Sequence, residues 1–113
     1  MRKLQPSLLL LLALAGCQSS DVSRAIGARC DLNAECDEKC LVDSHWPGGF
    51  CTLICDTNQK CGDHGVCIQE QGGGLCAFSC GSDPDCAFLG TGYMCQMVDG
   101  HTGGVKVMAC RAN

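Results

Sequence analysis

Aromatic residues are scarce in this chain of 113 residues. They make up only 4% of the sequence, and the five are Trp46, Phe50, Phe78, Phe88 and Tyr93. The 46% hydrophobic fraction is inflated by a leucine-rich N-terminus and by cysteine itself. Little apolar surface therefore remains for a sizeable core, and we expect the fold to need covalent support.

Clusters of Lys and Arg and long apolar runs are missing as well. The formal net charge is −4 and no stretch gathers basic residues, which disfavours nucleic acid and anionic membrane surfaces as electrostatic partners. The longest apolar run, Leu8 to Ala15, has eight residues, whereas a helix needs about 20 to span a bilayer. We therefore predict no transmembrane helix.

The first 16 residues have the pattern of a secretory signal peptide. Met1-Arg2-Lys3 is positively charged and precedes the apolar run. Ala13-Leu14-Ala15 is an A-x-A cleavage site, at which an ordinary signal peptidase would cut before Gly16. That cleavage would leave Cys17 as a free thiol on a secreted protein.

The segment Leu14-Ala15-Gly16-Cys17 resembles the lipobox of bacterial lipoproteins. This resemblance covers the first 17 residues. It implies cleavage between Gly16 and Cys17, a diacylglyceryl thioether on Cys17, and an acyl chain such as palmitate on the new amine. Two or more chains anchor a protein stably in a membrane. Enteric lipoproteins with Asp after the cysteine stay in the inner membrane, so Gln18 implies the outer membrane, on its periplasmic or surface face.

The residues between the leader and the next cysteine are predicted to be a flexible tether. Residues 18–29 contain Ser and Gly and show no apolar periodicity. The predicted organisation is therefore a leader at 1–16, a lipidated cysteine with its tether at 17–29, and a disulfide-rich domain at 30–113.

Thirteen cysteines occur, an odd number and a density typical of disulfide scaffolds in exported proteins. Apart from Cys17, they follow the pattern C-x5-C-x(3–8)-C-x(8–14)-C three times. The units span about 30–51, 55–76 and 80–110, with three residues between neighbouring units. This internal repeat predicts three tandem four-cysteine modules.

Each module is predicted to be a turn followed by a small β-hairpin. The middle residue of the first loop is Asn33, Asn58 or Asp83, whose side chains favour turns. Two short apolar stretches around a glycine-rich turn follow in every module, which is the pattern of a hairpin. The predicted fold class is therefore small and disulfide-rich, mostly coil with short β-hairpins.

Pairing inside a module leaves three choices for each set of four cysteines. Because the third and fourth cysteines are expected on facing strands, we expect each to be tied to the preceding loop. The spacing resembles the first four cysteines of EGF-like modules, although the C-x-C step and final loop of that family are missing. Cys80-Gly-Ser-Asp-Pro-Asp-Cys86 is also similar to dickkopf-type cysteine-rich domains. The EGF-like resemblance implies crossed pairing, which we favour: Cys30–Cys40, Cys36–Cys51, Cys55–Cys67, Cys61–Cys76, Cys80–Cys95 and Cys86–Cys110.

Metal binding competes with these structural interpretations. The C-x3-C steps fall within the spacing of zinc ligands, but thiols exported from the cytoplasm become oxidised. Asp31, Asn33 and Glu35 alternate like the start of a calcium-binding loop. The glycine required at the sixth position is Cys36 instead, so turn capping explains these side chains better. We predict no metal site and no cofactor.

Catalysis is also disfavoured. His45, His64 and His101 are scattered, one in each module, and no serine lies in a G-x-S-x-G setting. With the cysteines paired, no thiol nucleophile is expected. We therefore predict that the protein is not an enzyme.

One loop is a candidate binding loop: His45, Trp46 and Phe50 lie among proline and glycines at a predicted hairpin tip. Trp is typical of binding hot spots, and disulfides would preorganise such a loop. In the alternative interpretation Trp46 folds back over a disulfide and supplies a minimal core. The sequence leaves both open, with a slight preference for the core.

The pattern as a whole predicts a lipid-anchored, exported cysteine-rich protein of the cell envelope that acts as a non-catalytic binding or structural module. Its expected partners are the membrane, through the lipid on Cys17, and an extracellular or periplasmic protein, with no nucleic acid. One alternative is a small disulfide-rich protease inhibitor. Another is a secreted protein without lipid.

Overall fold

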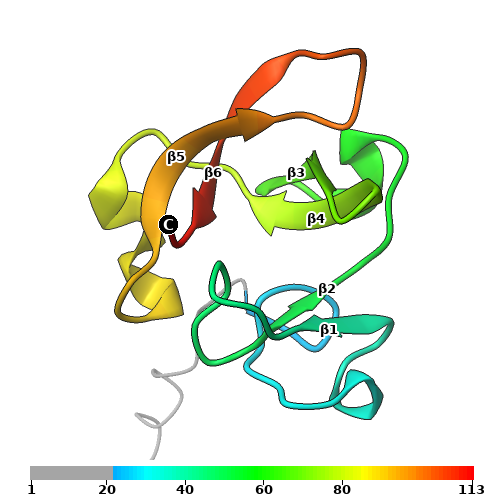
Figure 1. Cartoon of the computed structure of the whole chain (residues 1–113), viewed down its shortest axis with the longest axis vertical. Coiled ribbons are helices and arrows are strands. Elements are labelled where there is room, and N and C mark those ends of the chain that lie inside the picture. The colour runs from blue at the N-terminus through cyan, green and yellow to red at the C-terminus, as the bar shows by residue number, and fades with distance from the viewer. Residues whose placement is uncertain (1–21) are drawn as a thin grey trace, which may run out of the picture.

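The computed structural model describes residues 22–113. The predicted leader, the lipidation site at Cys17 and the start of the predicted tether lie outside the described residues. In chain order the elements are the 3-10 helix η2 (Asn33–Glu35), β1 (Lys39–Leu41), β2 (Phe50–Thr52), the 3-10 helix η3 (Asn58–Cys61), β3 (Gly65–Glu70), β4 (Gly73–Phe78), the 3-10 helix η4 (Asp83–Leu89), β5 (Met94–Asp99) and β6 (Lys106–Arg111) (Figure 1).

Three separate antiparallel hairpins make up the sheet structure, one in each module (Figure 1). The third and fourth cysteines of each module lie directly opposite each other: Cys40 faces Cys51, Cys67 faces Cys76, and Cys95 faces Cys110. The short apolar stretches of the sequence form these strands, and the glycine-rich segments join them. The predicted fold class is therefore confirmed.

Six disulfides tie the hairpins to the loops before them. They are Cys30–Cys40, Cys36–Cys51, Cys55–Cys67, Cys61–Cys76, Cys80–Cys95 and Cys86–Cys110. These are the six crossed pairs that we predicted. The crossed pairing means that both strands of every hairpin are bonded to the turn that precedes them.

The first loop of each module contains a 3-10 turn with a repeated polar contact. The middle side chain accepts a hydrogen bond from the backbone N–H of the third cysteine in its own module. The three contacts are Asn33 Oδ1 with Cys40 N (2.9 Å), Asn58 Oδ1 with Cys67 N (2.8 Å) and Asp83 Oδ1 with Cys95 N (2.9 Å). The Asn and Asp side chains therefore fix the loop to the hairpin as well as favouring the turn.

The three modules share one apolar core. The main buried cluster draws Leu41, Trp46 and Phe50 from the first module, Ile68, Leu75 and Phe78 from the second, and Leu89, Tyr93 and Val98 from the third. Phe50 is fully buried, and its ring centroid lies 4.8 Å from that of Trp46, 6.1 Å from that of Phe78 and 6.3 Å from that of Tyr93. Four of the five aromatic residues are therefore gathered where the modules meet, whereas Phe88 is 49% exposed.

The end of the predicted tether belongs to the folded domain, which corrects its expected boundary at residue 29. Ile26 is buried, Gly27 N–H donates to the Cys51 carbonyl (2.8 Å), and Cys51 N–H donates to the Ala28 carbonyl (2.9 Å). Gly27 has φ 98°, and a Cβ there would lie 2.7 Å from the Phe78 ring. Because these contacts are made to residues far along the chain, a local search for periodicity cannot find them.

Candidate functional site

The β1–β2 hairpin does not present its two aromatic side chains to solvent. Trp46 is 1% exposed and Phe50 is 0% exposed. The prediction that Trp46 and Phe50 are binding residues is therefore wrong. The structure supports the alternative interpretation, in which Trp46 is part of the core. Gly48 and Gly49 have φ 83° and 82°, and a Cβ on Gly49 would lie 1.7 Å from the Cys30 carbonyl oxygen. The loop therefore doubles back tightly and turns its rings inward.

His45, the third residue of the candidate binding loop, stays near the surface with 40% of its side chain exposed. Both backbone polar groups of His45 form hydrogen bonds. The N–H donates to Asp43 Oδ1 (2.9 Å), and the carbonyl accepts from Ala112 N–H (2.9 Å). The ring is therefore placed at the junction of the first and third modules.

The second and third modules add two charged side chains at the same place. Glu70, at the end of β3, and Arg111, at the end of β6, form an ion pair with 3.0 Å between Glu70 Oε1 and Arg111 Nη1. Their side chains are 9% and 19% exposed. We call Asp43, His45, Trp46, Glu70 and Arg111 the junction cluster, because it joins all three modules.

Glu70 is the centre of the junction cluster. Its Oε1 accepts from Arg111, and its Oε2 accepts from the Trp46 indole N–H (3.3 Å). His45 Nδ1 lies 3.8 Å from the same Oε2 and 3.7 Å from Asp43 Oδ1. A buried carboxylate needs such partners, and here they come from both neighbouring modules. Arg111 Nε is buried and has no hydrogen-bond partner in the part of the chain that the structure describes.

The second carboxylate of the cluster, Asp43, is held by the tip of the next hairpin. Gln71 Nε2 donates to Asp43 Oδ2 (2.9 Å). Gln71 and Gly72 both have positive φ, 53° and 86°, and form the two-residue turn between β3 and β4. The geometry of this turn therefore sets the position of both Gln71 and Glu70 against the first module.

The other two histidines lie elsewhere. His101 contacts the second module, with its Nδ1 2.8 Å from Gln69 Oε1 and its Nε2 3.9 Å from Asp56 Oδ1. The His64 carbonyl accepts from the Ser79 N–H (2.9 Å) near the end of the β3–β4 hairpin. The three histidines are thus not brought together into one site.

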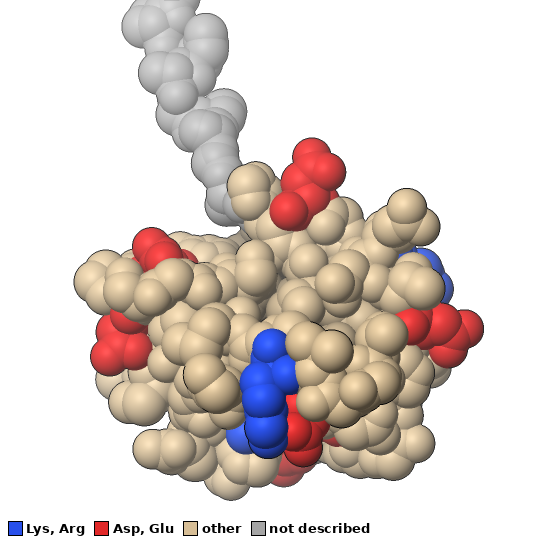
Figure 2. Space-filling view, turned by 90° about the horizontal axis from the view of Figure 1, so that it is seen from above, with Lys and Arg blue, Asp and Glu red and all other residues tan. Residues whose placement is uncertain are grey.

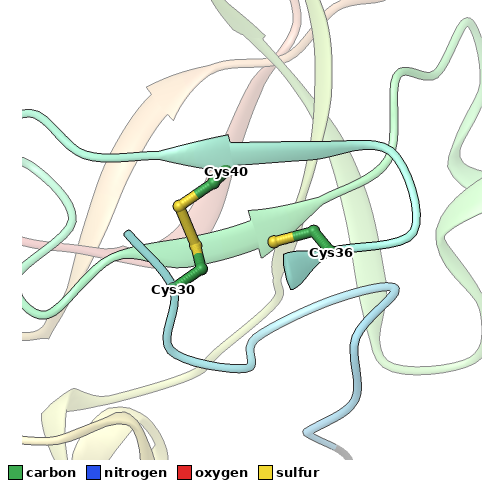
Figure 3. Close-up of side chains that lie close together, drawn as sticks. All are labelled: Cys30, Cys36 and Cys40. Carbon is green, nitrogen blue, oxygen red and sulfur yellow. A yellow bond between two sulfur atoms is a disulfide. The ribbon is translucent and has the colours of Figure 1, made fainter. Parts of the chain in front are cut away.

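Three groups of cysteines lie close enough to suggest metal ligands, but each includes a disulfide. In the group of Cys30, Cys36 and Cys40, the first and third sulfurs are bonded to each other (Figure 3). Cys36 forms its disulfide with Cys51. All twelve cysteines at residues 30–110 are paired. They therefore offer neither a thiolate ligand nor a thiol nucleophile.

The side chains of the calcium-like loop cap the turn. Glu35 Oε1 accepts hydrogen bonds from the backbone N–H groups of Asp31 (2.6 Å) and Leu32 (3.2 Å). Asn33 Oδ1 accepts a hydrogen bond from the Cys40 N–H. The hydrogen bond from Asp31, followed by that from Leu32, lowers the pKa of Glu35 below its ordinary value of 4.5. Capping is therefore the role that these contacts support.

The surface charges are dispersed. On the face shown in Figure 2, acidic side chains lie in separate small groups, and basic side chains form a narrow strip near the centre and a smaller group near the right edge. None of the helices within residues 22–113 is long and apolar enough to cross a membrane.

Sequence reasoning did not find Glu70, Arg111 or Asp43 as members of a site. No local signal marks them, because each is an ordinary charged residue at the edge of a hairpin. Only the packing of three modules brings them together. Comparison with protein-family models, with curated proteins and with solved structures gave no match.

Proposed function

We propose that this chain is an exported lipoprotein of the cell envelope, anchored by a lipid on Cys17, whose domain acts as a non-catalytic binding or structural module. The cysteine count carries this proposal. The twelve cysteines at residues 30–110 are paired among themselves, so Cys17 is the thirteenth and has no partner in the domain. It also ends the lipobox-like segment of the leader.

The domain itself is a small cysteine-rich module consistent with an exported protein. Disulfides persist outside the cytoplasm and are rare within it. Six bridges in a domain of this size also make it rigid and resistant to unfolding while it is exposed at the envelope. Both properties suit a scaffold or a binding module.

A lipid on Cys17 places the domain at a membrane surface, and Gln18 favours the outer membrane. Only four residues, 18–21, separate Cys17 from the described part of the domain, and five residue steps span at most about 18 Å. A partner would therefore be another envelope protein or one that reaches this surface.

The β5–β6 hairpin is the surface that we expect a partner to contact. Met97 and Met108 face each other across its strands and are 66% and 36% exposed, and Val105 at its turn is 58% exposed. Flexible Met side chains adapt to varied apolar surfaces. The β1–β2 loop gives no support to the protease-inhibitor alternative. Its aromatic side chains, Trp46 and Phe50, are buried in the core and are not exposed for contact with a protease.

The test is expression of the full chain in a bacterial host fed labelled palmitate, with mass spectrometry of the mature protein. We expect a mature chain that begins at Cys17, carries label, and shows no free thiol in the domain. Cys17→Ser should abolish the label, whereas the matched variant Ser19→Ala should keep it. A mature chain that begins at Gly16, with a free thiol and no label, would refute the lipid anchor and support the secreted alternative.

A further inference from the structure

Three metal-binding side chains converge in the junction cluster from two modules. Asp43, His45 and Glu70 each place one ligand atom so that all three atoms lie within 4.8 Å of one another. We propose that they form a binding site for a divalent transition-metal ion such as Zn²⁺ or Cu²⁺. This inference is independent of the lipid anchor, because it concerns only the folded domain.

The distances between the ligand atoms fit a shared ion better than hydrogen bonds. His45 Nδ1 lies 3.7 Å from Asp43 Oδ1 and 3.8 Å from Glu70 Oε2, which is beyond hydrogen-bond range. With metal–ligand bonds of about 2.0–2.2 Å in a tetrahedral site, neighbouring ligand atoms are about 3.3–3.6 Å apart. The two distances from His45 Nδ1 exceed this spacing by a few tenths of an ångström, and the third separation, between the Asp43 and Glu70 oxygens, is at most 4.8 Å.

The chemistry of the donors selects the class of metal. One imidazole nitrogen with two carboxylate oxygens suits Zn²⁺, Cu²⁺ and Ni²⁺, whereas Ca²⁺ and Mg²⁺ prefer sites made of oxygen alone. The described cysteines do not compete, because their sulfurs are in disulfides. With three protein ligands, a tetrahedral ion would keep one position for water or for a ligand from a partner.

Each carboxylate is already oriented by a second contact. Gln71 Nε2 and the His45 N–H hold the two oxygens of Asp43, both at 2.9 Å. Arg111 holds Oε1 of Glu70, and Oε2, which accepts from the Trp46 indole N–H, lies 3.8 Å from His45 Nδ1. Outer contacts of this kind fix the ligands of metal sites and raise affinity.

The proposed metal site is accessible from solvent and lies near the positively charged Arg111. Asp43 and His45 have side chains 45% and 40% exposed, so a hydrated ion can enter from solvent. Arg111 lies on the far side of Glu70 and opposes the positive charge of the ion, so we expect moderate rather than tight binding. The bound ion would tie the first-module loop to the second-module hairpin.

Trp46 provides the readout, because it is the only Trp of the chain and its Nε1 lies 3.3 Å from Glu70 Oε2. We would titrate the oxidised, exported protein with Cu²⁺ alone and follow quenching of Trp46 fluorescence. Zn²⁺ would then be added in large excess, because Cu²⁺ binds such a site more tightly than Zn²⁺ does. We expect saturable quenching with one ion per chain, reversal by Zn²⁺, and a rise in Tm when Zn²⁺ is present.

His45→Gln and Asp43→Asn should each lower the association constant by about tenfold or more, since each removes a ligand. His101→Gln is the matched control, because His101 also lies beside one carboxylate, and it should bind as the unaltered protein does. Circular dichroism and thiol titration would establish that each variant is folded and oxidised. The proposal fails if the unaltered protein shows no saturable quenching, or if folded His45→Gln binds Cu²⁺ as well as His101→Gln does.

Discussion

The first module supports the shared core in a different way from the other two. Its disulfides, Cys30–Cys40 and Cys36–Cys51, form a separate buried cluster with Ala28. Both disulfides of the second module and Cys86–Cys110 of the third belong to the main core. The strands of the first hairpin have three residues each, against six in the others.

The first module nevertheless supplies the centre of that core. Trp46 and Phe50 of its short hairpin pack against the other two modules in the main core. Its own disulfides lie in a separate cluster outside that core. In the second and third modules, disulfides and apolar side chains lie together in the main core. Disulfides and apolar core residues therefore need not lie in the same part of a repeat.

Phe50→Ala should give the largest loss, because it removes the ring at the meeting point of the modules. A fully buried Phe replaced by Ala costs about 3–5 kcal/mol in free energy of unfolding. Urea unfolding under non-reducing conditions, followed by the fluorescence of Trp46, would measure it. Trp46 should also become more exposed, since its centroid lies 4.8 Å from that of Phe50.

Leu32→Ala is the control for this variant, since Leu32 is in the same module but 65% exposed. We expect it to change the free energy of unfolding by less than about 0.5 kcal/mol. Equal losses for the two variants would show that the first module does not hold the core together.

Removing one disulfide from each kind of module tests the comparison directly. Cys86→Ala/Cys110→Ala should destabilise more than Cys30→Ala/Cys40→Ala. The loops closed have sequence separations of 24 and 10, and chain entropy alone makes the larger loop worth about 0.7 kcal/mol more. Loss of sulfur from the main core adds a cavity term, so we expect a total difference of about 1–2 kcal/mol.

The two variants should also differ in what they disturb. Trp46 fluorescence of folded Cys30→Ala/Cys40→Ala should match that of the unaltered protein, because the bridge lies outside the main core. Thermal unfolding of both variants, scanned without reductant, would rank them. If Cys30→Ala/Cys40→Ala proved the less stable variant, the first module's bridges would not be peripheral.

Local patterns in the sequence predicted the repeated parts of this molecule. Cysteine spacing, Asn or Asp in the first loops, and glycine-rich turns all act over fewer than about 25 residues within one module. They were enough for the hairpins and, with the EGF-like resemblance, for all six disulfides. In every module the backbone N–H of the third cysteine donates to the middle side chain of the first loop, Asn33, Asn58 or Asp83, although the two residues are 7, 9 and 12 positions apart.

Contacts between modules could not be predicted in this way. Trp46 and Phe50 lie among Pro and Gly, a setting shared by exposed loop tips and by tight turns that fold inward. No local sequence pattern indicates that Ile26 is buried. Glu70 and Arg111, which form an ion pair, are 41 residues apart in the sequence. These positions are fixed by how three hairpins pack, and the sequence of one chain carries no local record of that packing.

The smallest predicted effect concerns the first loops, where the first module differs from the second. Glu35 caps its turn, whereas the equivalent position in the second module is Lys60, which donates to the Ile54 carbonyl instead. Hydrogen bonds from Asp31 and Leu32 lower the pKa of Glu35 below 4.5. Because the folded-state pKa is depressed, the stability that Glu35 adds is full above its unfolded-state pKa and is lost as the pH falls through the folded-state value.

Glu35→Gln should therefore lower Tm slightly at neutral pH and make no difference once the pH is below the lowered folded-state pKa of Glu35, where both side chains are neutral. Asp56→Asn in the second module is the control, since the Asp56 side chain is 99% exposed, and it should show no comparable change. Thermal scans of the three proteins across this pH range would measure the effect. A Glu35→Gln deficit that stays constant down to the most acid pH would mean that the carboxylate charge does not stabilise the first loop, and that the first and second modules differ there in shape alone.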